Sequence, residues 1–113
     1  QMAPRTMKVA VLEAVGAFPI PAAARFLEAE LHGRDRERRR AAAAALAKHH
    51  REGRLATFLK LARAEDWALR NTAAWALGEL GGKDALTLLR KLTSDPEEVV
   101  ARTAKSALGK LGG

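Results

Sequence analysis

The chain repeats itself with a period of 31 residues, and this period constrains the fold more than any other feature of the sequence. The segment "AAWALGELGG" at 73–82 returns as "AKSALGKLGG" at 104–113. One and two periods earlier, the position of the Leu77–Gly78 pair is held by Leu46–Ala47 and Val15–Gly16. A second apolar series keeps the same spacing: Leu27, Phe58 and Leu89. Because two apolar series repeat together, each full copy is expected to contain two elements, each with one buried face.

The spacing of apolar residues within a copy is helical. In the third copy they recur at intervals of three and four: Leu69, Ala73, Ala76, Leu77 and Leu80. Alanine and leucine supply 25 and 16 of the 113 residues, and Tyr and Cys are absent, a balance that favours closely packed helices over sheets. We therefore expect an all-α fold of about seven antiparallel helices. One helix type is expected at 6–16, 36–48, 67–80 and 98–111, and the other at 21–32, 54–63 and 84–93.

An acidic residue precedes three of the four helices of the first type: Asp35, Asp66 and Asp95. A carboxylate in this place can accept hydrogen bonds from the unpaired N–H groups of the first turn, and it interacts favourably with the helix dipole. Pro96, directly after Asp95, suits the first position of a helix. Since a helix pair of this size cannot bury its apolar faces alone, the copies are expected to stack into an α-solenoid.

The pattern D-x-x-L-R-x-x-A-A-x-A-L-G at 66–78, followed by L-G at 80–81, resembles the bacterial HEAT-like repeat named after phycobilisome lyase subunits. The resemblance is sharpest over 64–113 and clear at 35–48. It implies a solenoid whose second helices line a concave, partner-binding face. It also implies a structural role for residues at the repeated motif positions: Asp35, Arg39, Asp66, Arg70, Asp95, Arg102, Gly78 and Gly109.

The repeat frame predicts a single HEAT-like domain over 1–113 with three and a half repeats. The half repeat lies at about 6–16, and the whole repeats lie at 21–48, 54–80 and 84–111. The first helix lacks the partner helix of its own repeat, and the chain starts with Gln1 rather than Met. We therefore expect a fragment of a longer protein, with the open first helix covered by another domain or by self-association with a second copy.

No residues form the sequence pattern of a catalytic or metal site. Ser94 and Ser106 are the only serines, and neither lies in a G-x-S-x-G pattern. The imidazoles are His32, His49 and His50. Adjacent histidines on a helix point about 100° apart and do not chelate one metal, so the pair is interpreted as a cationic helix C-terminus. With no apolar run of the roughly 20 residues that a bilayer span needs, we expect a cytoplasmic protein without cofactor, catalysis or membrane span.

The formal net charge of +7 is concentrated in one part of the chain, because eight basic residues face three acidic ones between 34 and 54. Three interpretations remain open for this segment. It could be a solvated face with local pairing to Asp35 and Glu37, a basic groove for an acidic protein segment, or a binding site for nucleic-acid phosphates. Trp67 and Trp75 are interpreted as covering a helix start and filling a gap between repeats, with surface anchoring of a partner as the alternative.

The sequence therefore predicts a non-catalytic module for protein interaction or scaffolding, with a basic patch on the second copy. The expected partner is an acidic protein or another domain of the same chain. The alternative is a module that binds the nucleic-acid backbone, including a DNA glycosylase-like protein. The residues expected to bind the partner lie on the second and third copies: Arg36, Arg38, Arg39, Arg40, Arg70 and Trp67.

Overall fold

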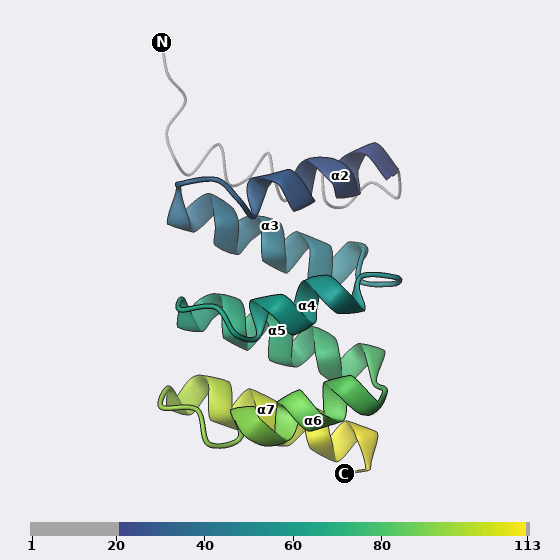
Figure 1. Ribbon diagram of the computed structural model, residues 1–113, viewed down its shortest axis with the longest axis vertical. Helices are drawn as coiled ribbons and strands as arrows, with labels where there is room; N and C mark the ends of the chain where they lie inside the picture. The colour runs from purple at the N-terminus through teal and green to yellow at the C-terminus, as the bar shows by residue number, and fades with distance from the viewer. Residues whose placement is uncertain (1–20, 113) are drawn as a thin grey trace. The chain divides into compact units, whose positions relative to one another are not determined.

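The computed structural model describes residues 21–112, which contain six α-helices and no strand (Figure 1). The helices are α2 (Pro21–Glu30), α3 (Arg36–His49), α4 (Leu55–Leu61), α5 (Trp67–Leu80), α6 (Lys83–Leu92) and α7 (Glu98–Leu111). Every boundary lies within two residues of the range expected from the sequence, so the all-α class and these six helices are confirmed. The helix expected at 6–16, and with it the count of seven helices and three and a half repeats, lies outside the described residues.

The chain divides into two compact units, 1–50 and 51–113. In the described part of the first unit, α2 packs against α3. In the second unit, α4 packs against α5 and α6 packs against α7. The two pairs of the second unit stack on each other mainly through α5 and α7, with further contact between α4 and α6. This stacking of one helix pair on the next is the arrangement that the repeat predicts.

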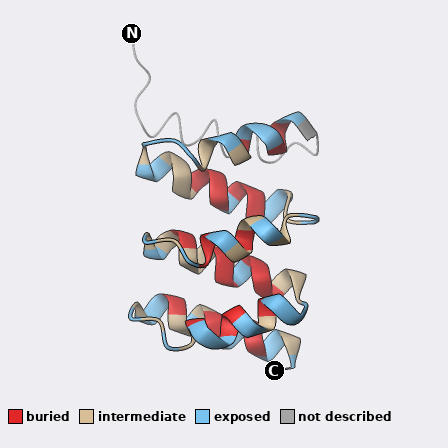
Figure 2. Ribbon diagram, viewed as in Figure 1, coloured by how far each residue is buried: buried red, intermediate tan, exposed pale blue. Residues whose placement is uncertain are grey.

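Residues spaced by 31 positions form the core of each unit, seen as the buried stripes in Figure 2. The largest fully buried side chains include members of both apolar series: Leu27, Leu46, Phe58, Leu77 and Leu89. Within the alanine run at 41–45, only Ala44 is exposed. The run therefore belongs to the packed core, where small side chains let helices approach closely.

Two of the three expected helix caps are present. The carboxylate of Asp35 accepts hydrogen bonds from the N–H groups of Glu37 at 2.9 Å and Arg38 at 3.2 Å. The carboxylate of Asp66 accepts from the N–H of Ala68 at 3.1 Å. These bonds satisfy donors that the first helical turn leaves without a partner, and so fix where α3 and α5 begin.

The start of α7 differs from the expectation. This helix begins at Glu98 and its N-cap is Glu97, so the expectation that Asp95 caps it and that Pro96 opens it is wrong. The 31-residue period gives the reason, since the residue one period after Asp66 is Glu97. The carboxylate of Asp95 still accepts from the N–H of Glu97 at 2.9 Å, within the loop that precedes the helix.

Asp95 is instead the partner of an arginine on the neighbouring helix pair. The Nε and Nη2 groups of Arg70 donate to the two carboxylate oxygens of Asp95, at 2.8 and 3.0 Å. Nη1 of the same guanidinium donates to the backbone carbonyls of Ala64 at 2.9 Å and Glu65 at 2.8 Å. The side chains of Arg70 and Asp95 are 15% and 5% exposed. One guanidinium thus joins the loop before α5 to the loop before α7.

Arg102, expected to support the packing of repeats, lies on the surface of α7. Its Nη2 group donates to Glu98 Oε1 at 2.8 Å, one helical turn earlier, and both side chains are largely exposed. One period after Arg70 the chain has Ala101, so the repeat frame supplies no second guanidinium at this position. The ion pair of Arg102 is therefore local to its own helix.

Gly78 marks a close approach between α5 and α7. A Cβ atom at this position would lie 2.6 Å from Cβ and 3.1 Å from Cα of Ala107. Both distances are shorter than ordinary contacts between carbon atoms, so only glycine fits here without displacing α7. Gly109, one period later, has open space around its own Cβ position.

We predict that Gly78→Ala destabilises the protein, because the added methyl group must push α7 away from α5. Overpacking of this kind costs about 1–3 kcal/mol, only partly offset by the better helix propensity of alanine. Gly109→Ala is the matched control and is expected to stabilise by about 0.5–1 kcal/mol, since only the propensity changes. Urea unfolding followed by circular dichroism measures both. Equal effects of the two substitutions would contradict the close approach.

The stability that the Arg70–Asp95 pair contributes depends on pH. Hydrogen bonds from Arg70 hold the pKa of the Asp95 carboxyl below its ordinary value, despite the opposing effect of burial. Because the folded pKa is the lower one, the pair contributes its full stability above the unfolded pKa of about 3.9 and loses it as the pH falls further.

Asp95→Asn is therefore expected to lower the free energy of unfolding by about 2 kcal/mol at pH 7. The difference from the unsubstituted protein should shrink as the pH falls from about 4 to about 2.5, because the Asp95 carboxyl is protonated in that range in the unfolded and then in the folded state. Urea unfolding across this range measures it, with Asp84→Asn at an exposed aspartate as the control. A difference that stays constant as the pH falls would refute a stabilising role for the Asp95 carboxylate.

Candidate functional site

Two of the arginines expected to bind a partner on α3 are used inside the first unit. Arg38 Nη2 lies 2.6 Å from Glu30 Oε1 on α2. Arg39 Nη1 donates to the backbone carbonyl of Gly33 at 2.8 Å. Arg70, one period after Arg39, makes the same kind of bond to a carbonyl six residues earlier. Arg38 and Arg39 therefore fix the α2–α3 pair and its loop.

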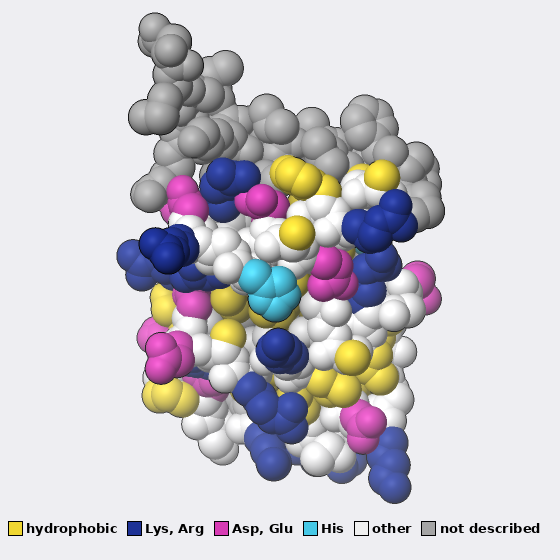
Figure 3. Space-filling view, turned by 45° about the horizontal axis from the view of Figure 1, so that its top comes forward, with side chains coloured by type: hydrophobic (Ala, Val, Ile, Leu, Met, Phe, Trp, Pro, Cys, Tyr) yellow, Lys and Arg dark blue, Asp and Glu magenta, His cyan; other side chains and the backbone are white. Residues whose placement is uncertain are grey.

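The remaining arginines near the start of α3 line an open depression of about 560 Å³ together with two acidic residues. Its lining consists of Arg34, Asp35, Arg36, Glu37 and Arg40. Because acidic side chains lie in the same lining, part of the positive charge is offset locally. Acidic and basic side chains are also interspersed on the molecular face drawn in Figure 3. The surface around the start of α3 is therefore of mixed charge.

The expected partner-binding residues on α5 differ in their accessibility. Trp67 opens the helix and is 40% exposed, whereas Arg70 is mostly buried against Asp95. The Asp95 hydrogen bonds also raise the pKa of Arg70, so its guanidinium stays charged within that pair. Trp75, interpreted from the sequence as filling a gap between repeats, is 39% exposed. That interpretation is wrong, because the repeated position it occupies faces solvent.

The 31-residue frame contains the signal that the sequence analysis missed. The residues in register with Trp75 are Ala44 and Ser106, and all three are exposed. A position that holds alanine and serine in other copies has no need of a large apolar side chain for the core. A tryptophan there is better explained as a surface feature.

One face of Trp75 carries a cation from the same unit. Arg51 Cζ lies 5.4 Å from the centroid of the indole ring, within the range of a cation–π interaction. Arg51 Nη2 also lies 3.6 Å from Glu79 Oε1, and the ammonium group of Lys110 donates to Glu79 Oε2. The hydrogen bond from Lys110 lowers the pKa of the Glu79 carboxyl. Glu79 is thus a carboxylate shared by two cations.

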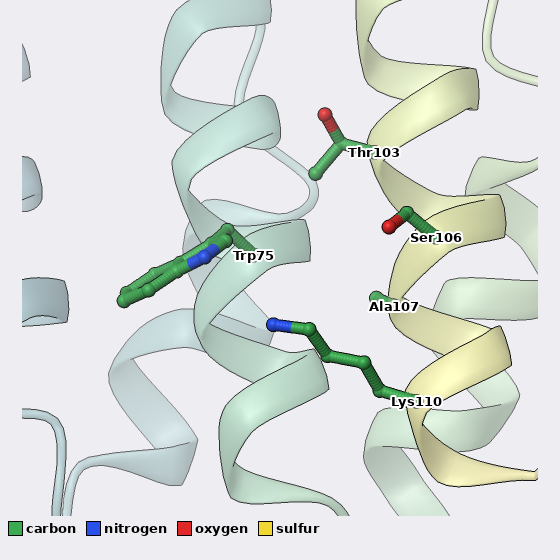
Figure 4. Close-up of a pocket in the computed structure, with 5 residues that line it drawn as sticks. All are labelled: Trp75, Thr103, Ser106, Ala107 and Lys110. Carbon is green, nitrogen blue, oxygen red and sulfur yellow. The ribbon is translucent and has the colours of Figure 1, made fainter.

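Beside Trp75 lies a small pocket between α5 and α7, which we call the Trp75 pocket (Figure 4). It has a volume of about 170 Å³ and is lined by Trp75, Thr103, Ser106, Ala107 and Lys110. The Ser106 hydroxyl and the Lys110 ammonium both point from α7 toward α5 in Figure 4. The Thr103 hydroxyl donates to Asn71 Oδ1 at 2.5 Å, whereas that of Ser106 has no hydrogen-bond partner among the described residues.

The other candidates for chemistry do not assemble into a site. His49 and His50 lie at the end of α3 with their ring centroids 6.5 Å apart. Within residues 21–112, no three His, Asp or Glu side chains come together in a group that could hold a metal ion. None of the helices in this range is long and apolar enough to cross a membrane.

Comparison with known protein families agrees with this architecture. The family model of HEAT repeats matches residues 24–109, which extend from α2 into the last turn of α7. No curated protein matches the chain. The matched range includes both helix series, the Arg70–Asp95 pair and the close approach at Gly78. Since the match covers more than half of its length, the chain belongs to the HEAT-repeat family.

Proposed function

We propose that this protein is a non-catalytic scaffold that binds another protein through the surface formed by α5 and α7. HEAT repeats generally serve as scaffolds for protein interaction, because stacked helix pairs present extended surfaces. The observation that carries the proposal is the partial exposure of Trp75 beside a pocket with walls on both helices. Tryptophan side chains at such places contribute much of the binding energy of protein interfaces once a partner covers them.

The basic patch predicted on the second copy has a smaller part in this proposal. Arg38, Arg39 and Arg70 are engaged in contacts within their own units. Arg34 and Arg36 are exposed and remain available for a peripheral contact with an acidic partner. Charges at the edge of an interface mainly affect how fast and how selectively partners associate.

Binding to the nucleic-acid backbone is the second candidate, supported by the net charge of +7. It is less well supported, because affinity for phosphates needs several cations that can approach the backbone together. The arginines at the start of α3 share their depression with Asp35 and Glu37.

The test places the photo-crosslinking residue p-benzoylphenylalanine at Ser106, beside the Trp75 pocket. The matched control carries it at Thr87, an exposed position on α6. After irradiation in the native host, we expect protein adducts at position 106 that survive nuclease treatment, and few at position 87. Adducts of equal yield at both positions, adducts removed by nuclease, or none at either position would contradict the proposed function.

A further inference from the structure

The Trp75 pocket combines an aromatic face with hydrogen-bond donors, and its lining contains no acidic side chain. Its volume of about 170 Å³ is well below the 300–1,000 Å³ or so of a typical small-molecule site, and it suits a single amino-acid side chain. The Lys110 side chain is 52% exposed, and the Ser106 hydroxyl lacks a partner among the described residues. Both donors are therefore accessible to a group that enters from solvent.

A second depression continues the surface along α7. It has a volume of about 400 Å³ and is lined by Val99, Arg102, Thr103 and Ser106, so it shares two residues with the Trp75 pocket. Val99 is 46% exposed and offers an apolar contact at its far end. From Val99 to Lys110 the helix rises by about 16 Å, the reach of about five residues of extended chain.

Two charged side chains line these depressions, and both are basic: Arg102 and Lys110. Helix α7 carries three basic residues and one acidic residue: Arg102, Lys105, Lys110 and Glu98. Glu98 is paired with Arg102, and the one acidic residue of α5, Glu79, already accepts two cations. No contact occupies the Lys105 ammonium among the described residues. A negatively charged ligand is the complement of this surface.

We propose that the α5–α7 surface binds an extended acidic segment of a partner protein, one of whose side chains packs against Trp75 while neighbouring carboxylates pair with the cations of α7. This inference rests on the proposed function and adds the chemistry of the partner. A cationic segment fits less well, because the chain's own Arg51 already covers a face of the indole and binds Glu79.

The test introduces a charge of either sign at Ser106, where a longer side chain reaches solvent without breaking a contact. Ser106→Glu and Ser106→Lys are compared with the same two substitutions at Ser94, the other serine, which is exposed in the loop before α7. The probe is a fluorescein-labelled random copolymer of glutamate and tyrosine, with polylysine and a duplex DNA as alternatives. Fluorescence anisotropy at low and at moderate salt measures the affinity.

For an acidic partner, we expect Ser106→Glu to weaken binding of the copolymer about five-fold and Ser106→Lys to strengthen it about three-fold. The Ser94 variants should stay within about two-fold of the unsubstituted protein, because their charge lies outside the depressions. Trp75→Ala should weaken binding about ten-fold without loss of helical circular dichroism, since its side chain lies outside the core.

Equal effects at Ser94 and Ser106, the opposite order of the two Ser106 variants, or no binding of the copolymer would overturn the inference. So would tighter binding of polylysine or of duplex DNA than of the copolymer. The two proposals fail separately. If position 106 crosslinks to proteins but the acidic copolymer does not bind, only the chemistry of the partner is wrong. If position 106 yields no protein adducts, the proposed function itself is wrong.

Discussion

The steric contact between Gly78 and Ala107 is the constraint on which the second unit depends. It brings the backbones of α5 and α7 so close that no residue larger than glycine fits at position 78 without a shift. The core side chains around this contact are small or are leucines buried on one face of each helix. Once the two helices are held at this separation, polar groups along their length fall within bonding distance of one another.

Three polar interactions connect the segment formed by α5 and the loop before it with the segment formed by α7 and the loop before it. They are the bidentate pair of Arg70 with Asp95, the hydrogen bond between Asn71 and Thr103, and the ion pair of Glu79 with Lys110. Only the last of these joins residues one full period, 31 positions, apart. Asn71 and Thr103 are 32 positions apart.

Much of this fold could be predicted from the sequence, because its period and its apolar spacing are local properties. The six described helices, the caps at Asp35 and Asp66, and the burial of the alanine run all follow from short-range rules. The start of α7 could not be predicted in this way. Asp95 resembles a helix cap in the sequence, but its carboxylate accepts a hydrogen bond from the guanidinium of Arg70, 25 residues away. Such a competition between a local and a distant partner is decided only by three-dimensional packing.

The candidate site was harder to predict for the same reason. The arginine run from 38 to 40 suggested a basic groove, but Arg38 and Arg39 have partners that the sequence alone does not identify. Trp75 was interpreted as filling a gap between repeats, yet its repeated position is exposed. The walls of its pocket belong to two repeats, and their juxtaposition depends on how the pairs stack.

That division of the walls has a consequence for the dynamics of the protein. The Trp75 pocket exists only while the α6–α7 pair is docked on the α4–α5 pair, since Trp75 comes from one and its other lining residues from the other. A repeat protein can open locally, by release of one helix pair from its neighbour. An occupant of the pocket therefore binds the docked state alone, and by mass action it suppresses the release of the α6–α7 pair from the α4–α5 pair. Ligand binding and the local exchange of backbone amides in α6 and α7 are thus linked by a single equilibrium.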